Sequence, residues 1–200
     1  MKPIRLQTQE PVKRAAILIP ICVVDNRVSL MYVVQPSVLT DHKEKVNFPG
    51  DIKHEDDRTF ADTALRASET LLGLDTSTVN VWGEGKLIVS RSDFSFIPVI
   101  GEITGSLNLN KMNMKADVEE IFTVPIQDLC NTKMNAYTQF KDEYSSPVFM
   151  GGKWRIWGFT AMVTNLFLKS LLATDGYAHP IQYVPSIKKG TTFPKTTRKH

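Results

Sequence analysis

Residues 48–74 read FPGDIKHEDDRTFADTALRASETLLGL, and this stretch carries the strongest structural signal in the chain. A polar loop separates Phe48-Pro49-Gly50 from a segment whose apolar side chains recur at helical spacing, at Phe60, Ala64, Ala67 and Leu71. Asp57 or Thr59 is suited to cap the start of this segment, and Gly73 stands where a left-handed C-cap belongs. The pattern predicts a loop, a helix bounded by these caps, and a second loop.

The segments around this stretch alternate between strand-like and helix-like patterns. Apolar runs rich in β-branched residues predict strands over residues 15–24, 28–35, 79–82, 86–89, 94–103, 136–140, 147–150 and 153–157. Helical spacing predicts short pieces over 117–122 and 125–130 and a long amphipathic helix over 159–173, while polar composition predicts loops over 36–47 and 107–115. This order of elements predicts an α+β class.

The composition is that of an ordinary globular protein. The chain has 200 residues, 42% of them hydrophobic and 22% charged, and its net charge of +3 is too small to indicate a nucleic-acid partner by itself. We expect a lead-in over residues 1–13, one domain over 14–174 and a basic, flexible tail over 175–200. No apolar run reaches the roughly 18 residues that a membrane span needs. The two isolated cysteines, Cys22 and Cys130, fit a reducing, intracellular compartment.

Residues 48–74 resemble the Nudix box, the loop–helix–loop of the Nudix hydrolases, and their spacing matches the coenzyme A diphosphatase branch of that family. Further blocks resemble the same branch in the same order, at residues 14–20, 120–125, 147–149 and 156–161. The resemblance covers roughly residues 12 to 173. It implies a Nudix fold, with a mixed β-sheet sandwiched between helices.

The resemblance also implies an activity, the hydrolysis of coenzyme A to 4′-phosphopantetheine and 3′,5′-ADP with Mg²⁺ or Mn²⁺. It favours a mitochondrial location, with the cytosol as the alternative. The last three residues, Arg198-Lys199-His200, are not the Ser-Lys-Leu peroxisomal address. A coenzyme A-like or nucleotide-like small molecule is the expected partner, and a homodimer is compatible with the sequence.

The helix positions that bind the metal in the family have changed. There the glutamates of the box hold a cation that bridges the diphosphate and activates water. In this chain those three positions hold Ala67, Thr70 and Leu71. Glu69 cannot replace them, because each helical residue turns by about 100°, which places Glu69 about 100° from Thr70 and about 200° from Ala67. The replacements predict that hydrolysis is impaired or lost.

Several acids remain near the box. Asp57 occupies the position of the loop acid, and Asp117 falls where the branch has a Glu outside the box, as a candidate base or extra ligand. A substitute metal site would use Asp57 and Asp117 with Asp51 or Glu55. The alternative is a solvated acidic loop in which Asp57 caps the helix. In either case Arg66 is expected to support the loop, paired with Asp57.

The coenzyme A motif upstream of the box is also altered. Thr40 replaces its usual Arg and Glu44 its usual Gly. The positions that still suit a ligand with phosphates are His42, Lys43, Lys45, Phe48 and Gly50. A charged surface loop would present the same residues. Trp154 is a second candidate contact, because its ring could stack on a base.

Three functions are compatible with these observations. The first is a catalytically impaired Nudix protein that acts by binding a ligand or partner. The second is an active diphosphatase with relocated acidic ligands. The third is an RNA-binding or complex-binding module that uses Trp154 and the basic tail.

Overall fold

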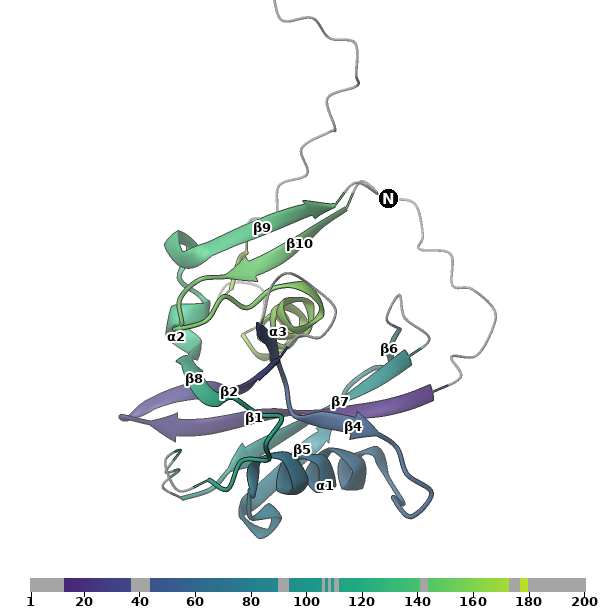
Figure 1. Ribbon diagram of the computed structural model, residues 1–200. Helices are drawn as coiled ribbons and strands as arrows, with labels where there is room; N and C mark the ends of the chain where they lie inside the picture. Colours follow the sequence, from purple (N-terminus) through teal and green to yellow (C-terminus); the bar gives the residue numbers. More distant parts are fainter. Residues whose placement is uncertain are drawn as a thin grey trace, which may run out of the picture.

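The computed structural model describes residues 13–36, 44–89, 94–105, 107, 109, 112–140, 144–172 and 177–179. Its largest feature is a mixed sheet of eight strands within this described part (Figure 1). The strands are β1 (Lys13–Val24), β2 (Arg27–Pro36), β3 (Glu44–Asn47), β4 (Gly50–Ile52), β5 (Val79–Glu84), β6 (Ile88–Val89), β7 (Phe94–Ile103) and β8 (Glu120–Pro125). The order β3-β2-β1-β7-β5 forms the spine of the sheet, to which β4, β6 and β8 add on β1, β7 and β2 respectively.

The central strand β1 is buried on both faces. It runs parallel to β7 and antiparallel to β2 and β4, so the sheet is mixed. Successive side chains of a strand point to opposite faces. Ala16 and Leu18 therefore join one apolar cluster, and Ile17 and Ile19 join the other. This explains why β1 is continuously apolar rather than alternating.

Helices cover the two faces of the sheet. In Figure 1, α1 (Phe60–Leu72) lies below the sheet and α3 (Gly158–Leu171) above it. The hairpin of β9 (Asn135–Phe140) and β10 (Tyr144–Phe149) and the short α2 (Ile126–Leu129) lie on the same side as α3. Two short 3₁₀ turns, η1 (Thr76–Thr78) and η3 (Thr132–Met134), precede β5 and β9. The α+β class is confirmed.

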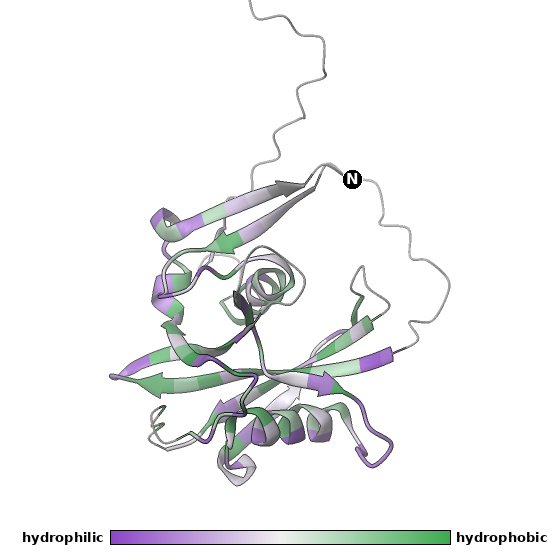
Figure 2. Cartoon of the chain, in the orientation of Figure 1, coloured by the Kyte–Doolittle hydropathy of each residue, from purple (hydrophilic) through white to green (hydrophobic). Residues whose placement is uncertain are grey.

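The hydropathy colouring in Figure 2 follows these layers. Helix α1 alternates between hydrophobic and hydrophilic positions, as expected of a helix with one face on a sheet. Among the described residues, no helix has the length and apolar character needed to cross a bilayer.

Both ends of α1 have clear sequence causes. Thr59 is the N-cap and forms a capping box with Asp62, with hydrogen bonds of 3.0 and 2.8 Å. Of the two cap candidates, Thr59 therefore holds the position and Asp57 does not. Gly73 ends the helix with φ of 63°, as predicted, and the Cβ of any other residue there would lie 3.0 Å from Asn113.

Three sequence predictions of secondary structure were wrong. Residues 117–122 do not form a helix, because β8 pairs antiparallel with β2 there, placing Phe122 opposite Tyr32. The loop predicted over 36–47 contains strand β3, which pairs with β2, whereas residues 37–43 lie outside the described part. The strand predicted over 153–157 is reduced to one bridge between Ile156 and Phe149.

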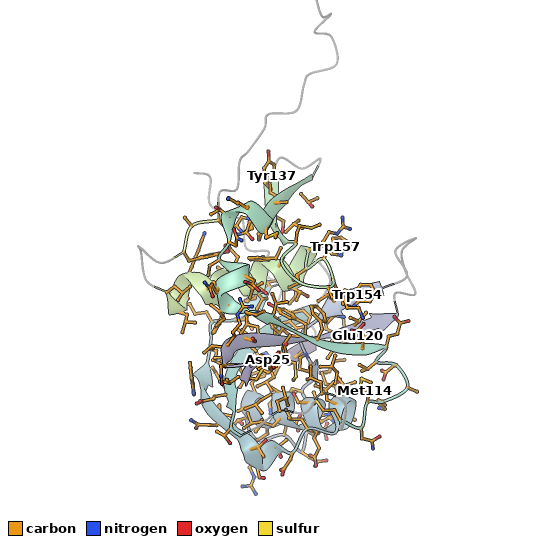
Figure 3. All side chains as sticks on the ribbon, turned by 90° about the vertical axis from the view of Figure 1, so that its left-hand side faces the viewer. Asp25, Met114, Glu120, Tyr137, Trp154 and Trp157 are labelled. Atoms are coloured by element: carbon orange, nitrogen blue, oxygen red, sulfur yellow. The ribbon has the colours of Figure 1, made fainter. Side chains whose placement is uncertain are left out.

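Trp154 lies on the α3 side of the molecule, and its ring is partly buried against the apolar cluster there (Figure 3). Its Nε1 donates to Glu120 Oε2 at 2.9 Å, and Lys153 Nζ lies 2.7 Å from Glu120 Oε1. Trp157 is half-buried, with the Arg155 guanidinium 5.4 Å from its ring centroid. The edge of the Trp154 ring is thus bonded to another residue of the protein, and part of the ring packs against the apolar cluster.

Residues 177–179, which belong to the expected tail, contact the folded core. Tyr177 and His179 are both buried. The Tyr177 hydroxyl donates to Asn165 Oδ1 of α3 at 3.0 Å, and His179 Nε2 lies 2.7 Å from the Ala136 carbonyl oxygen of β9. These contacts bring the segment 177–179 against α3 and β9, while residues 180–200 of the expected tail lie outside the described part.

Candidate functional site

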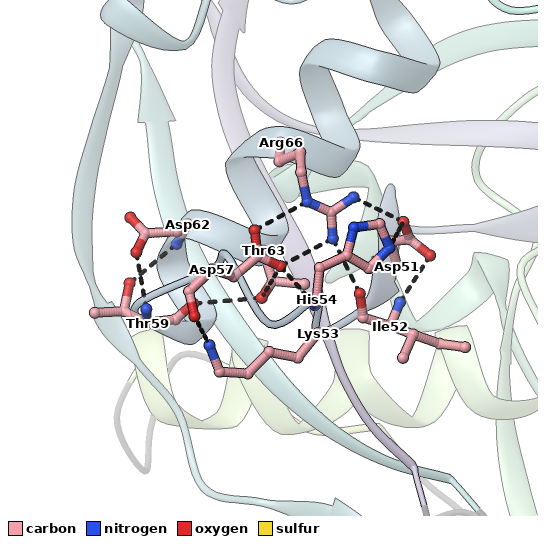
Figure 4. A network of polar contacts seen from close by, with 9 residues as sticks. All are labelled: Asp51, Ile52, Lys53, His54, Asp57, Thr59, Asp62, Thr63 and Arg66. Carbon is pink, nitrogen blue, oxygen red and sulfur yellow. Dashed lines mark hydrogen bonds and ion pairs between the residues drawn. The ribbon is translucent and has the colours of Figure 1, made fainter.

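The loop between β4 and α1 is organised around the Arg66 guanidinium (Figure 4). Arg66 Nε and Nη2 donate to the two carboxylate oxygens of Asp57, each at 2.9 Å. Arg66 Nη1 donates to Asp51 Oδ2 at 2.9 Å and Nη2 to the Ile52 carbonyl at 3.0 Å. One planar cation therefore holds two carboxylates and a backbone carbonyl, which come from β4 and from the loop that follows it.

Asp57 is the most heavily bonded acid of this loop. Besides the two bonds from Arg66, its carboxylate accepts from the His54 amide at 2.9 Å and from Thr63 Oγ1 at 3.0 Å. Its side chain is 6% exposed. The hydrogen bond from Arg66 is the main reason why the pKa of Asp57 falls far below its ordinary value. Asp57 is thus an anchor that is ionised at neutral pH and whose oxygens already have donors.

Asp51 and Arg66 respond to the same contacts. Burial raises the pKa of Asp51, but the hydrogen bonds from Arg66 and the Ile52 amide lower it by more, so the net shift is downward. The hydrogen bond to Asp57 raises the pKa of Arg66. Lys53 Nζ also donates to the Asp57 backbone carbonyl. The contacts of Asp51, Lys53, Asp57 and Arg66 therefore stabilise the same conformation of the loop.

The three family metal positions on α1, Ala67, Thr70 and Leu71, carry no carboxylate. Ala67 is buried, with 1% of its surface exposed, and Leu71 packs against the apolar cluster on the α1 side of the sheet. Thr70 and Glu69 are exposed. The Leu71 carbonyl accepts the Lys115 amide at 2.9 Å, so the segment that leads to Asp117 is tied to the end of α1. Asp117 itself is exposed.

A cleft of about 490 Å³ lies on the α3 side of the sheet. Its floor is formed by β1 and β7, its wall by β3, β4 and the end of β2, and its roof by the first turn of α3. The lining residues are Ala15, Ile17, Gln35, Lys45, Asn47, Phe48, Gly50, Asp51, Ile52, Phe94, Phe96, Phe159 and Thr160. Because Asp51 lines the cleft and bonds to Arg66, the cleft and the charged loop are adjacent.

Three of the predicted ligand-contacting residues border this cleft, namely Lys45, Phe48 and Gly50. Phe48 is 5% exposed and its ring stacks on Tyr32 at 4.8 Å. A Cβ on Gly50 would lie 2.5 Å from the Ala16 carbonyl oxygen, so glycine is required where β4 pairs with β1. Phe48 and Gly50 therefore shape the cleft through packing. His42 and Lys43 lie outside the described residues.

Comparisons with known proteins agree with this architecture. The chain is 34% identical over 182 residues to the mitochondrial coenzyme A diphosphatase NUDT8 of Mus musculus, covering 88% of this chain and 85% of that protein. It is 34% identical over 169 residues to the Homo sapiens protein of the same name, covering 82% of this chain and 71% of that protein. The chain belongs to the Nudix hydrolase family. No family model matches the sequence.

The Nudix fold is also found among solved structures. A MutT/nudix family protein from Enterococcus faecalis superposes with a TM-score of 0.51 at 10% identity, covering 80% of this chain and 62% of that one. At this identity the likeness concerns the fold alone. The mixed sheet between helices that the resemblance implied is therefore confirmed as a Nudix fold.

The residues of this Nudix helix do not suit a hard divalent cation. Mg²⁺ and Mn²⁺ take oxygen ligands in near-octahedral geometry, which requires converging carboxylates. At the family positions stand a buried methyl, an exposed hydroxyl and a packed isobutyl group, from Ala67, Thr70 and Leu71. Among the described residues, no three of the His, Cys, Asp and Glu side chains converge as a metal site requires.

Sequence reasoning missed most of the cleft. Phe94 and Phe96 are two apart on a strand, so they share a face, and this spacing was a usable signal. Gln35 and Asn47 gave no such signal, because they meet only through the pairing of β2 with β3. Phe159 reaches the cleft only because α3 packs on this face of the sheet.

Proposed function

We propose that this Nudix protein binds a coenzyme A-like or nucleotide-like ligand and has lost metal-dependent diphosphate hydrolysis. The observation that carries the proposal is the face of α1 at Ala67, Thr70 and Leu71, which offers no anionic oxygen. The ligand class is supported by the similarity to coenzyme A diphosphatases and by a cleft of about 490 Å³, a size typical of small-molecule sites.

The loop acids do not compensate for the missing glutamates. Arg66 binds the carboxylates of both Asp51 and Asp57, and the Asp57 oxygens are occupied by donors from Arg66, His54 and Thr63. A cation entering this loop would have to displace the Arg66 guanidinium and break these bonds. The hydrogen-bonding capacity of the Asp57 carboxylate is therefore met by groups of the protein itself.

The decisive experiment is a turnover assay with the full chain, coenzyme A and Mg²⁺ or Mn²⁺, following release of 3′,5′-ADP. The mouse relative serves as the positive control. We expect coenzyme A to bind, as measured by calorimetry, without metal-dependent product. Turnover at the rate of the mouse protein would overturn the proposal. If such turnover were lost in Asp57→Asn or Asp117→Asn, the second hypothesis, a diphosphatase with relocated ligands, would replace it.

We also propose a mitochondrial location for this chain. The support is that the mouse and human relatives are named as mitochondrial proteins. Fractionation of cells expressing the full chain tests this, with recovery in the cytosol as the contradicting result. A role of the basic tail in binding RNA stays a prediction, because residues 180–200 lie outside the described part.

A further inference from the structure

The segment 177–179 is held on the core by a buried hydrogen-bond network. The side chains that form it, those of Asn165, Tyr177 and His179, belong to residues that are each 8% exposed or less. The Tyr177 hydroxyl donates to Asn165 Oδ1 at 3.0 Å and lies 3.3 Å from His179 Nδ1. His179 Nε2 lies 2.7 Å from the Ala136 carbonyl oxygen. The network therefore ties the segment to two elements, α3 and β9.

The contact with β9 fixes where a neutral His179 ring carries its proton. A carbonyl oxygen only accepts hydrogen bonds, so Nε2 holds the proton and donates it to Ala136. Nδ1 of the neutral ring then keeps its lone pair. The ring also forms a T-shaped contact with the Phe149 ring, with the centroids 5.0 Å apart and the planes at 80°. The docked position therefore suits an imidazole without charge, held by one polar contact and one apolar contact.

A protonated His179 ring is disfavoured in this position. Burial lowers the pKa of His179, the bond to Ala136 raises it by less, and the Lys169 ammonium of α3 lowers it again, so the net shift is downward. Among the described residues, no carboxylate forms an ion pair with the ring that would offset the burial of a charge. A proton on Nδ1 would meet the Tyr177 oxygen, but one neutral acceptor replaces only part of the water that a cation loses on burial.

The neighbouring titratable groups keep their charge state near neutral pH. Burial raises the pKa of Tyr177 and also that of Cys130, which lies at the end of α2 and acts on Tyr177. Both groups therefore stay neutral between pH 5 and pH 8. The other histidine in the described part of the chain, His54, is exposed and lies beside Asp51 in the loop that precedes α1. His179 is thus the member of this network that titrates in that range.

We propose that His179 is a pH-sensitive latch, which docks the segment 177–179 on α3 and β9 while its ring is neutral and releases the segment when the ring gains a proton. In the released segment the ring is in water, where its pKa returns to about 6.5. Because the docked state binds the proton more weakly than the released state, docking is complete above that pH and weakens as the pH falls below it. The latch does not depend on whether the protein binds or hydrolyses coenzyme A.

The test follows cleavage of the full chain by chymotrypsin after Tyr177 between pH 5 and pH 8, with the products identified by mass spectrometry. Protection is the cleavage rate of a free peptide with the same sequence divided by that of the protein, so the pH dependence of the protease cancels. We expect constant protection above about pH 7 and a fall below about pH 6.5, by at most about 10-fold per pH unit, the limit for one proton. His54→Gln removes an exposed imidazole and is the matched control, which should leave this profile unchanged.

The variant His179→Gln keeps a side-chain NH₂ group that can donate to Ala136 but cannot titrate, so protection should no longer change with pH. If this variant is undocked at every pH, NMR titration of the His179 ring in the native chain decides, with an expected pKa below about 6.5. Constant protection of the native chain, a pH dependence that survives in His179→Gln or disappears in His54→Gln, or a His179 pKa of about 6.5 or more would each overturn the proposal.

Discussion

Arg66 and Asp57 are joined by two parallel hydrogen bonds of 2.9 Å, from Nε to Oδ1 and from Nη2 to Oδ2. Here both oxygens of Asp57 are taken by the guanidinium, by an amide and by a hydroxyl. The pair thus serves to hold the loop on the helix.

The substitution Arg66→Lys should destabilise the protein by about 2 kcal/mol, because an ammonium cannot make the two-pronged contact and leaves a buried acceptor without its donors. Urea unfolding measures the loss. Arg27→Lys is the control, because the Arg27–Asp128 pair, with side chains 43% and 36% exposed, should cost less than about 1 kcal/mol. Equal losses in the two variants would show that the loop cluster contributes no more than a surface pair.

Stability should fall in acid because of Asp57. The contacts with Arg66 lower the pKa of this group in the folded state relative to the unfolded value of about 3.9. Its contribution is therefore fully present above about pH 4 and is lost as the pH falls through the lower folded pKa. Chemical unfolding between pH 6 and pH 2 should show this slope, and Asp57→Asn should flatten it. An unchanged slope in that variant would exclude Asp57 as the cause.

The substitution Ala67→Glu should destabilise the protein by several kcal/mol, on the order of 3, because it places a charge where the native side chain is 1% exposed. Thr70→Glu, on the exposed part of the same helix, should change stability by less than about 0.5 kcal/mol. Thermal and urea unfolding compare the two. If both were tolerated equally, the helix face would be open rather than packed.

Gly50→Ala should destabilise the protein by about 1–3 kcal/mol or prevent folding, because its Cβ would meet the Ala16 carbonyl oxygen at 2.5 Å and the Ile17 Cγ2 at 2.6 Å. The backbone of β1 cannot move without disturbing its pairing with β7. Gly152→Ala is the control, since its Cβ would meet only the Val124 Cγ2 within 3.0 Å. The soluble yield and the unfolding midpoint are compared for the two variants. A Gly50→Ala variant as stable as Gly152→Ala would refute the close approach of β4 to β1.

Tyr177→Phe should reduce stability by about 1 kcal/mol, because it leaves Asn165 Oδ1 without its buried donor. Tyr137→Phe, on the half-buried face of β9, should stay within about 0.5 kcal/mol of the native protein. Unfolding midpoints compare the two tyrosines. No difference between them would mean that the segment 177–179 is not stably docked on α3.

Local patterns were sufficient for much of the fold. The continuous apolar run predicted the central strand β1. The helical spacing of apolar residues, followed by Gly73, predicted α1. Both signals are local, because burial and backbone geometry relate residues that are close in the sequence. The identities at positions 67, 70 and 71 are likewise read directly from the chain. The sequence by itself thus determined the Nudix fold and the absence of glutamates from that face of the helix.

Only the tertiary structure decided how the remaining groups are used. The sequence pattern predicted a helix over residues 117–122, whereas in the structure residues 120–125 form a strand that pairs with β2. Local spacing does not reveal such a pairing, because the partner strand is far away in the sequence. In the same way, the commitment of Asp51 and Asp57 to one guanidinium and the meeting of Gln35, Asn47 and Phe159 around one cleft arise between distant elements. Hydrogen bonds and packing between such elements depend on positions in space, which no local spacing of residues encodes.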